Sequence, residues 1–248
     1  MNNYFKTLKH ILEGSYNITF LSGAGISTAS GLPDFRGDKD GFWKKNKPVY
    51  FSEFKSSKKA RIKSWENNIA IQSKIQDAQP TKMHKMINKV LKNSNLNFHI
   101  TQNIDGLHKS ENVDSEQIIE LHGNIFHAQC LDCNESYKTK SFYESIVKKR
   151  GDSVCPKCCR GFVKVSTISF GQNLNLSVLN KAKSASENCD YFIAVGSSLQ
   201  VSPANNFIRI AKNNGAQIII LNYDPTPFDG EASIIINEYL ENICDEIA

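Results

Sequence analysis

Five short apolar runs recur along this chain of 248 residues, and stretches of helical character separate them. The runs are Asn17–Ser22, Phe98–Gln102, Tyr191–Gly196, Ala216–Asn222 and Ser233–Ile236. Helical character is clearest over Met83–Leu91, Leu176–Ala185 and Pro203–Asn213. Strands this apolar are buried on both faces, which favours a parallel sheet with helices on either side. The pattern therefore predicts a doubly wound α/β fold.

Two stretches interrupt this alternation. Gly37–Gln79 is rich in lysine with scattered aromatic residues, and Phe126–Val165 contains five of the seven cysteines. We interpret both as insertions that pack together as a smaller lobe, with a ligand cleft between the lobes. The predicted Rossmann-like domain comprises residues 1–37, 82–125 and 166–248. The predicted small lobe comprises a helical module at 38–81 and a cysteine-rich module at 126–165.

The composition is that of a globular protein, with 40% hydrophobic and 22% charged residues. The net charge of +5 comes from short, scattered lysine runs, so a solvated surface is favoured and a nucleic-acid partner is not expected. No apolar segment reaches the roughly 18 residues of a membrane helix, and the N-terminus has no signal-peptide pattern. We therefore predict a cytoplasmic protein without a membrane partner.

Cys130-x-x-Cys133 and Cys155-x-x-Cys158 are two cysteine pairs separated by 21 residues. Two such pairs bind one zinc ion through four thiolates, and a site with four cysteines and no open position is structural. In a reducing compartment these cysteines are not expected to form disulfides. Cys159 adjoins Cys158 and leaves the fourth ligand ambiguous, although the Cys-Pro-x-Cys sequence favours Cys158.

The first apolar run leads directly into Gly23-Ala24-Gly25. A strand, a glycine turn and a helix N-terminus let the backbone approach a pyrophosphate, so the turn is a candidate dinucleotide site. The third glycine of the usual motif is displaced to Gly31, and no acidic residue follows a second strand at the usual distance, which disfavours a hydride-transfer cofactor. Phe35 and Arg36 follow in a proline-containing loop, where the arginine suits a phosphate and the aromatic ring can shield a reactive sugar carbon.

Polar residues follow the second apolar run, at Asn103, Asp105 and His108. The carboxyl ends of strands in an open α/β sheet face the ligand crevice, so these side chains are expected there. His122 follows in the block Glu120-Leu121-His122-Gly123. Histidine titrates near neutral pH, which makes His122 the predicted general base beside this amide and carboxylate cluster.

Several longer motifs occur in one order from near the N-terminus to about residue 229. They are GAGISTASGLPDFRG (23–37), QNIDGLH (102–108), LHG (121–123), both cysteine pairs, FGQ (170–172), GSSLQVSPA (196–204) and LNYDPTPFD (221–229). In this combination and order the chain resembles the sirtuins of bacterial type, which are NAD-dependent protein-lysine deacylases with a structural zinc ribbon. The combination is far more specific than any one motif.

The resemblance implies NAD as co-substrate and one structural zinc ion, and it implies a set of NAD-binding residues. The cofactor loop would contain Gly23, Ala24, Gly25, Thr28, Phe35 and Arg36. Gln102, Ile104 and Asp105 would frame the nicotinamide and its ribose, with Asp105 accepting from the carboxamide, while Asn103 would position the reacting ribose or a water. The adenosine half and the phosphates would be held by Gly196, Ser197, Ser198, Asn222 and Asp224.

The resemblance also implies the reaction. Nicotinamide leaves as the acyl oxygen of the substrate lysine attacks C1′ of the ribose. His122 then takes a proton from the ribose hydroxyls, so that the 2′-oxygen attacks the imidate carbon, and the products are lysine, nicotinamide and O-acyl-ADP-ribose. The acylated protein or peptide would lie extended between Ile168–Gly171 and Gln200–Ser202. Its expected contacts are Ile168, Phe170, Gly171, Gln200 and Val201.

Some positions differ from common sirtuin residues, and none of them removes a catalytic group. Gln172 replaces glutamate, Ser202 tyrosine, Val165 proline, and Cys159-Arg160 a Gly-Gly pair. Sirtuins that prefer succinyl or malonyl groups carry Tyr-x-x-Arg in the helical insertion. The corresponding stretch here, residues 59–67, has Arg61 without the tyrosine. We therefore predict acetyl or longer apolar acyl groups as substrates.

Two alternative functions are compatible with parts of the pattern. An enzyme of the same fold would mono-ADP-ribosylate proteins or hydrolyse NAD, but bare hydrolysis needs neither a peptide groove nor a zinc ribbon. A zinc-ribbon binding module with a vestigial nucleotide fold is disfavoured because Asn103, Asp105 and His122 are all present. The sequence thus favours a deacylase.

Overall fold

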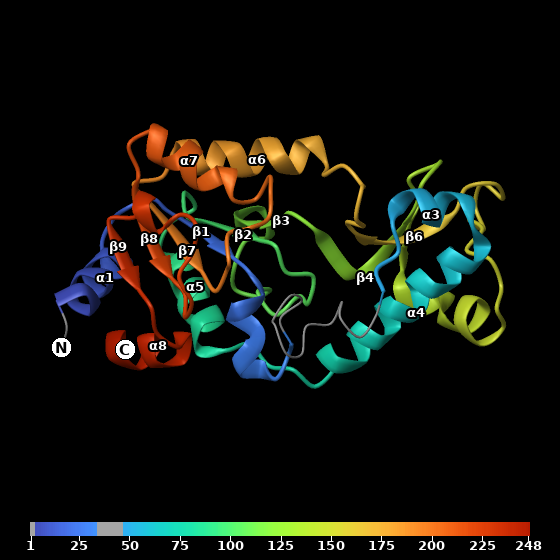
Figure 1. Ribbon diagram of the computed structural model, residues 1–248, viewed down its shortest axis with the longest axis horizontal. Coiled ribbons are helices and arrows are strands. Elements are labelled where there is room, and N and C mark those ends of the chain that lie inside the picture. The colour runs from blue at the N-terminus through green and yellow to red at the C-terminus, as the bar shows by residue number, and fades with distance from the viewer. Residues whose placement is uncertain (1–2, 34–46) are drawn as a thin grey trace.

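The computed structural model describes residues 3–33 and 47–248, and it consists of a larger and a smaller lobe along its long axis (Figure 1). The larger lobe is built on a six-stranded sheet of order β3-β2-β1-β7-β8-β9, in which every neighbouring pair is parallel. Its strands are β1 Ile18–Ser22, β2 Phe98–Thr101, β3 Ile118–Glu120, β7 Tyr191–Val195, β8 Gln217–Leu221 and β9 Ile234–Ile236. All but β3 lie within the predicted apolar runs, and β3 was missed because its sequence, Ile-Ile-Glu, has only two consecutive apolar residues.

Helices cover both faces of this sheet (Figure 1). One face carries α6 Leu176–Glu187 and α7 Asn206–Asn213, and the other carries α1 Asn3–Glu13, α5 Lys82–Asn93 and α8 Leu240–Ile247. Successive residues of a strand point to opposite faces. Phe20 of β1 therefore packs in the core with α1, α5 and α8, whereas Leu21 packs in the core with α6 and α7. The doubly wound α/β prediction is confirmed.

Two helix starts differ from the sequence prediction. The glycine turn leads into η1, a short 3₁₀ helix at Ala24–Ser30, and not into an α-helix. α7 begins at Asn206 because Pro203 lies in the turn that precedes it. Among the described residues, none of these helices combines the length and the apolar character that crossing a bilayer requires.

The smaller lobe contains a three-stranded antiparallel sheet of order β5-β4-β6. Its strands are β4 Gly123–Cys130, β5 Ser136–Lys138 and β6 Val163–Thr167, and the short helical segments η3 Thr139–Phe142 and η4 Tyr143–Lys148 follow β5. The helices α3 Phe51–Ser56 and α4 Lys58–Ile75 pack against this sheet. Trp65 of α4 is fully buried there, and its indole N–H donates to Val163 O at 3.2 Å. The two insertions therefore form one lobe, as predicted.

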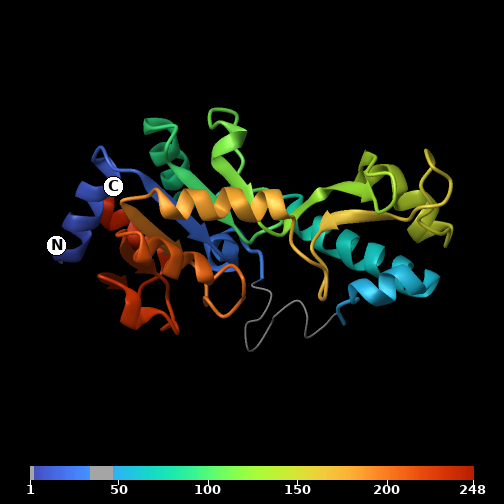
Figure 2. The same cartoon turned by 90° about the horizontal axis from the view of Figure 1, so that it is seen from above.

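β4 and β6 join the two lobes, which lie end to end when seen from above (Figure 2). β4 starts directly after His122, and its first residue, Gly123, pairs with Thr167 at the end of β6. Both strands run across the divisions predicted at 125/126 and 165/166. The sheet of the smaller lobe thus begins at the residue after His122, close to the edge of the large sheet.

Candidate active site

A cleft of about 930 Å³ lies where the central parallel strands end. The segment after each strand lines it: Gly23–Gly25 after β1, Gln102–Ile104 after β2, Gly196–Ser198 after β7 and Asn222–Asp224 after β8. Thr28 and His122 line the same cleft. Open α/β sheets bind ligands at this edge, and the volume suits a cofactor-sized molecule. The fold therefore brings together most of the residues predicted to contact the dinucleotide.

The glycine turn packs directly against Gly196, the residue after β7. Gly25 N donates to Gly196 O at 2.8 Å, and Gly23 N donates to Val195 O at 3.1 Å. A Cβ on Gly25 would lie 2.8 Å from Gly196 O, and one on Gly196 would lie 2.5 Å from Ile26 N. These glycines therefore permit close contact between two backbone segments. Their own N–H groups are used within the protein, and the approach of a pyrophosphate to this turn stays a prediction.

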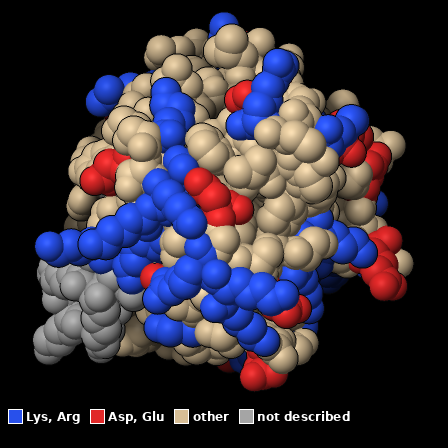
Figure 3. All heavy atoms as spheres, turned by 90° about the vertical axis from the view of Figure 1, so that its right-hand side faces the viewer, with Lys and Arg blue, Asp and Glu red and all other residues tan. Residues whose placement is uncertain are grey.

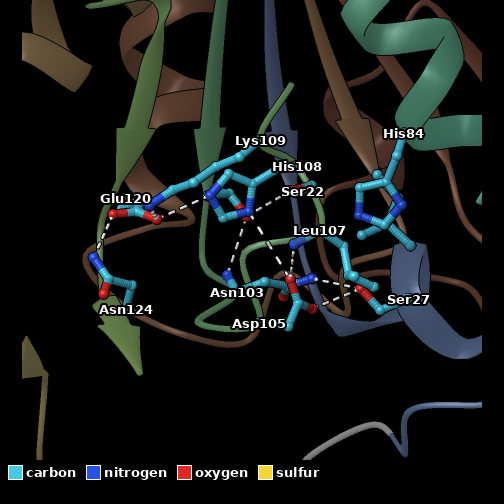
Figure 4. Close-up of polar contacts among 12 residues, drawn as sticks. Ser22, Ser27, His84, Asn103, Asp105, Leu107, His108, Lys109, Glu120 and Asn124 are labelled. Carbon is cyan, nitrogen blue, oxygen red and sulfur yellow. Dashed lines mark hydrogen bonds and ion pairs between the residues drawn. The ribbon is translucent and has the colours of Figure 1, made fainter. Parts of the chain in front are cut away.

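Ser27 fixes the two polar residues that follow β2 (Figure 4). Its Oγ donates to Asp105 Oδ2 at 2.7 Å and accepts from Asn103 Nδ2 at 3.2 Å. Asn103 Nδ2 also donates to Gly23 O at 3.1 Å, and Leu107 N donates to Asp105 Oδ1 at 3.0 Å. Asp105 lines a small cavity that shares Ala24 with the main cleft. Sequence reasoning missed Ser27, and its place just after the glycine turn was the available signal.

His108 lies between two carboxylates, with its ring almost completely buried. Its Nε2 is 3.0 Å from Glu120 Oε1, and its Nδ1 is 3.9 Å from Asp105 Oδ1 (Figure 4). Burial acts to raise the pKa of Glu120, but hydrogen bonds from His108, Asn124 and Lys109 outweigh it and set that pKa at about 2. An ionised carboxylate on β3 is thus connected through one imidazole to the carboxylate beside the cleft.

Two further buried histidines lie behind this network. His99 Nε2 is 2.8 Å from Ser22 Oγ, and its ring packs edge-to-face on His108 with centroids 6.1 Å apart. His84 Nδ1 accepts from Thr81 N at 3.2 Å, at the start of α5. Burial lowers the pKa of His84 to about 4 and the pKa of His99 well below its ordinary value. Both side chains are therefore neutral at pH 7.

His122 is held by a backbone carbonyl in the cleft. Its Nδ1 is 2.9 Å from Gln102 O. A carbonyl oxygen only accepts hydrogen bonds, so Nδ1 carries a hydrogen and Nε2 is the ring position that takes a proton. The carbonyl of His122 accepts from Ile168 N at 3.0 Å. The predicted base is thereby linked to the segment predicted to contact the peptide.

The segments predicted to flank a peptide meet at the cleft. Ile168, Phe170, Gln200 and Val201 line it, and Gly171 follows Phe170 with a positive φ of 75°. Phe51 N donates to Phe170 O at 2.9 Å. The carbonyl of Phe170 is thus fixed by the start of α3, so the helical insertion helps to position this wall of the cleft.

One face of α4 forms another wall of the cleft through Ser64, Asn67, Asn68 and Ile71. This face extends beyond the 59–67 stretch considered from the sequence. Arg61 lies elsewhere: its guanidinium makes two hydrogen bonds to Asp152, at 2.6 and 2.7 Å, and packs 3.6 Å from the ring centroid of Phe162. Within residues 3–33 and 47–248, no lysine or arginine lines this cleft.

The four predicted zinc ligands converge in the smaller lobe. The Sγ atoms of Cys130, Cys133, Cys155 and Cys158 all lie within 4.8 Å of one another, and two pairs are 3.7 Å apart. A tetrahedron with Zn–S bonds of about 2.3 Å has sulfur–sulfur edges of roughly 3.8 Å, so the cluster fits a zinc ion. The side chain of Cys159 is exposed, and its Sγ faces Pro156 O. The geometry thus favours Cys158 as the fourth ligand.

The predicted cofactor loop is described only in part. Phe35 and Arg36 fall outside the described residues, and their roles stay predictions.

Tyr223 and Tyr239, which were not predicted, stack with ring centroids 4.4 Å apart and line the cleft beside Asn222. No periodicity or motif connects two tyrosines on separate loops, so the sequence carried no signal for this pair.

Comparison with known proteins gives one family. The model described as the Sir2 family matches residues 23–203. The chain is 39% identical over 232 residues to NAD-dependent protein deacetylase 1 of Bradyrhizobium diazoefficiens, covering 92% of this chain and 89% of the relative. It is 35% identical over 251 residues to NAD-dependent protein deacylase 2 of Archaeoglobus fulgidus, covering 100% of this chain and 97% of the relative.

Solved structures give the same result. A structure from work on the mechanism and regulation of Sir2 enzymes has a TM-score of 0.79 at 34% identity, covering 100% of this chain and 98% of that one. A structure of Sir2 bound to an acetylated peptide has a TM-score of 0.81 at 28% identity, covering 98% of this chain and 96% of that one. The similarity therefore includes both lobes.

Proposed function

The chain belongs to the Sir2 family and is an NAD-dependent protein deacylase, and we propose that His122 is its general base. The hydrogen bond between His122 Nδ1 and Gln102 O, 2.9 Å long, carries this proposal. It leaves Nε2 to accept a proton in a cleft that is large enough for NAD and an acylated lysine. In the proposed reaction, Nε2 takes the proton of a ribose hydroxyl after nicotinamide has left.

Asn103 and Asp105 orient the reacting half of NAD in this proposal. Asn103 Nδ2 uses both of its hydrogens, on Gly23 O and Ser27 Oγ. Its Oδ1 is therefore the atom that can accept from the ribose or from a water. Asp105, fixed by Ser27 and Leu107, accepts from the nicotinamide carboxamide, and Gln102 and Ile104 frame the ring.

The rest of the dinucleotide extends along the strand ends in this proposal. Gly23, Ala24, Gly25 and Thr28 approach the phosphates, together with Gly196, Ser197 and Ser198, and Asn222 and Asp224 bind the adenosine half. These residues line one continuous cleft. The acylated peptide adds as an extended segment between 168–171 and 200–202. The relative solved with an acetylated peptide supports a substrate of this kind.

We propose acetyl or longer apolar acyl groups as the preferred substrates. The α4 face of the cleft is uncharged, and Arg61 is committed to Asp152 and to the carbonyls of Phe54 and Lys55. Among the described residues no lysine or arginine lines this cleft, so an acyl carboxylate would be desolvated there without a cation from them to pair with. A panel of acylated peptides checks this, and faster turnover of succinyl-lysine than of acetyl-lysine would contradict it.

Two predictions from the sequence stay proposals. We propose a cytoplasmic location, as expected in the sequence analysis. The division into residues 1–37, 82–125 and 166–248 against 38–81 and 126–165 rests on the alternation of apolar runs.

His122→Ala tests the assignment of the base, with His127→Ala as the matched control. His127 is an exposed histidine on β4. We expect formation of O-acetyl-ADP-ribose to fall by about 10²–10⁴-fold in His122→Ala, while exchange of free nicotinamide into NAD persists, because the base acts after nicotinamide leaves. His127→Ala keeps both activities.

The same assay separates the deacylase from a NAD hydrolase. Wild-type protein is incubated with NAD, with and without an acetyl-lysine peptide, and the small-molecule product is identified by mass spectrometry. Nicotinamide release that does not depend on the peptide, or product formation that survives His122→Ala, would overturn the assignment.

A further inference from the structure

Basic residues are concentrated in the smaller lobe. Residues 47–81 and 126–165 contain fifteen Lys and Arg against seven Asp and Glu, whereas the whole chain has 30 against 25. The remaining residues are therefore net acidic. Figure 3 faces the end of the molecule formed by the smaller lobe, and a broad band of Lys and Arg crosses it, with Asp and Glu side chains interspersed and at its edges. The net positive charge of the protein thus belongs to this one end.

Two segments that are distant in the sequence form this surface. We define the basic face by Lys58, Lys59 and Lys63 of α4 and by 148–150, all of which are exposed. Arg150 pairs with Glu66 of α4, and Arg61 of α4 pairs with Asp152. Arg61 first, and Lys58 to a smaller extent, lower the pKa of Asp152. The fold therefore brings together short lysine runs that are scattered in the sequence.

Two of these α4 lysines occupy positions that helix energetics disfavour. Lys58 and Lys59 occupy the first turn, which contains no acidic residue, and the positive end of the helix dipole repels cations. None of the three lysines makes an ion pair with a residue in the described part of the chain. Lys58 and Lys59 therefore lie at an unfavourable position of the helix without an ion pair that would offset the cost. A sequence that accepts such a cost points to a functional constraint.

We propose that the basic face binds the phosphate backbone of nucleic acid without sequence preference. A protein partner requires an apolar or aromatic centre in the interface. Among the exposed large apolar side chains of the described residues, only Val154 lies in 126–165, and only Tyr50, packed on Phe170 beside the cleft, lies in 47–81. A phosphate backbone requires only cations, and binding is then dominated by counterion release. This activity is separate from deacylation and does not rest on it.

The test compares two triple variants of the full-length zinc-loaded protein. One carries Lys58→Gln, Lys59→Gln and Lys63→Gln on α4. The other carries Lys85→Gln, Lys89→Gln and Lys92→Gln, which removes the same charge from the exposed side of α5 in the larger lobe. Binding to a fluorescent 20-base-pair DNA duplex is followed by anisotropy between 50 and 200 mM salt. Deacetylation of an acetyl-lysine peptide, expected to be unchanged in both, shows that the variants are folded.

We expect the wild type to bind the duplex with an affinity that falls steeply with salt. The α4 triple should bind at least about tenfold more weakly, and its slope of log K against log salt should be smaller by roughly 2 to 3, because each phosphate contact contributes about 0.9. The α5 triple should remain close to the wild type. Equal weakening in both triples, or absence of binding at 50 mM salt, would each overturn the proposal.

Discussion

The two lobes are stabilised by different physical means. In the larger lobe the buried strand positions are mostly Ile, Leu, Val, Phe and Ala, and these apolar side chains fill two cores on either side of the sheet; the buried polar exceptions are Thr19, Ser22, His99 and Thr101. The smaller lobe has a sheet of only three strands, and its core includes the predicted zinc-ligand cysteines Cys130 and Cys155 beside Trp65. A sheet this small buries too little apolar surface to be stable alone, so a metal cross-link substitutes for the missing core.

The two lobes are also expected to contribute different parts of the function. The base, the amide and the glycine turn are attached to the ends of buried strands, so their positions are set by the larger lobe. The smaller lobe supplies the α4 wall of the cleft, and β6 leads into the peptide-flanking segment. Changes to the smaller lobe should therefore affect folding of that lobe and peptide use, while changes at the strand ends should affect NAD.

The largest effect is expected from removing a zinc ligand. Cys158→Ser should release the metal and unfold the smaller lobe, because structural zinc contributes on the order of 10 kcal/mol to folding of such sites. Deacetylation should then be undetectable, while the larger lobe keeps its cooperative unfolding. The measurement is zinc content together with tryptophan fluorescence, since both tryptophans fall within 38–81.

Cys159→Ser is the matched control for that substitution. Its thiol is exposed and lies outside the four-sulfur cluster. We expect full zinc content and a change in unfolding free energy within about 0.5 kcal/mol. Zinc loss in Cys159→Ser with retention in Cys158→Ser would show that the adjacent cysteine is the ligand.

The next largest effect is expected in the larger lobe, from Gly25→Ala. The new Cβ would lie 2.8 Å from Gly196 O and 2.9 Å from Gly196 Cα, so the glycine turn must move away from β7. We expect the KM for NAD to rise by about 10²-fold, since a displacement near 1 Å at a binding site has effects of this size. Gly230→Ala, where nothing lies within 4 Å of the new Cβ, is the control. An unchanged KM for NAD in Gly25→Ala would show that the glycine turn does not contribute to NAD binding.

The sequence specified the larger lobe better than the smaller one, for a physical reason. Apolar runs report burial on both faces of a strand, so β1, β2, β7, β8 and β9 were visible, and the edge strand β3 was not. The zinc ligands were predictable because the spacing of two Cys-x-x-Cys pairs is typical of a tetrahedral zinc site. The role of Ser27 between Asn103 and Asp105 depends on three segments meeting in space, and the basic face depends on α4 lying beside 148–152, so neither follows from local pattern.

A third prediction concerns acid stability, which should be limited by the histidines of the larger lobe. The pKa of His84 is lowered by burial to about 4, while the unfolded chain titrates near 6.5. Between these values the unfolded state binds the extra proton, so the stabilising contribution is complete above pH 6.5 and is lost as the pH falls toward 4. From pH 7 to pH 5 this amounts to about 2 kcal/mol.

His84→Asn tests this, because its side-chain oxygen can still accept from Thr81 N but does not titrate. Urea unfolding at pH 7 and pH 5 should show a smaller acid loss in His84→Asn than in the wild type. His99, whose pKa is also depressed by burial, accounts for part of the remaining loss. An equal loss in both proteins would show that His84 does not contribute to the acid sensitivity.

The smallest effect is expected from Cys159→Gly, and Leu199→Gly, at the same backbone conformation in the larger lobe, is its comparison. Cys159 in the smaller lobe has φ 57° and is exposed, whereas Leu199 in the larger lobe has φ 54° and is 2% exposed. A left-handed residue other than glycine costs about 1 kcal/mol, and glycine itself adds roughly 0.5–1 kcal/mol of chain entropy to the unfolded state. Cys159→Gly should therefore stabilise by at most about 0.5 kcal/mol. Leu199→Gly gains the same relief but loses a buried side chain, so it should destabilise by about 2–4 kcal/mol. Urea midpoints measure both, and stabilisation by Leu199→Gly would mean that backbone strain outweighs burial at position 199.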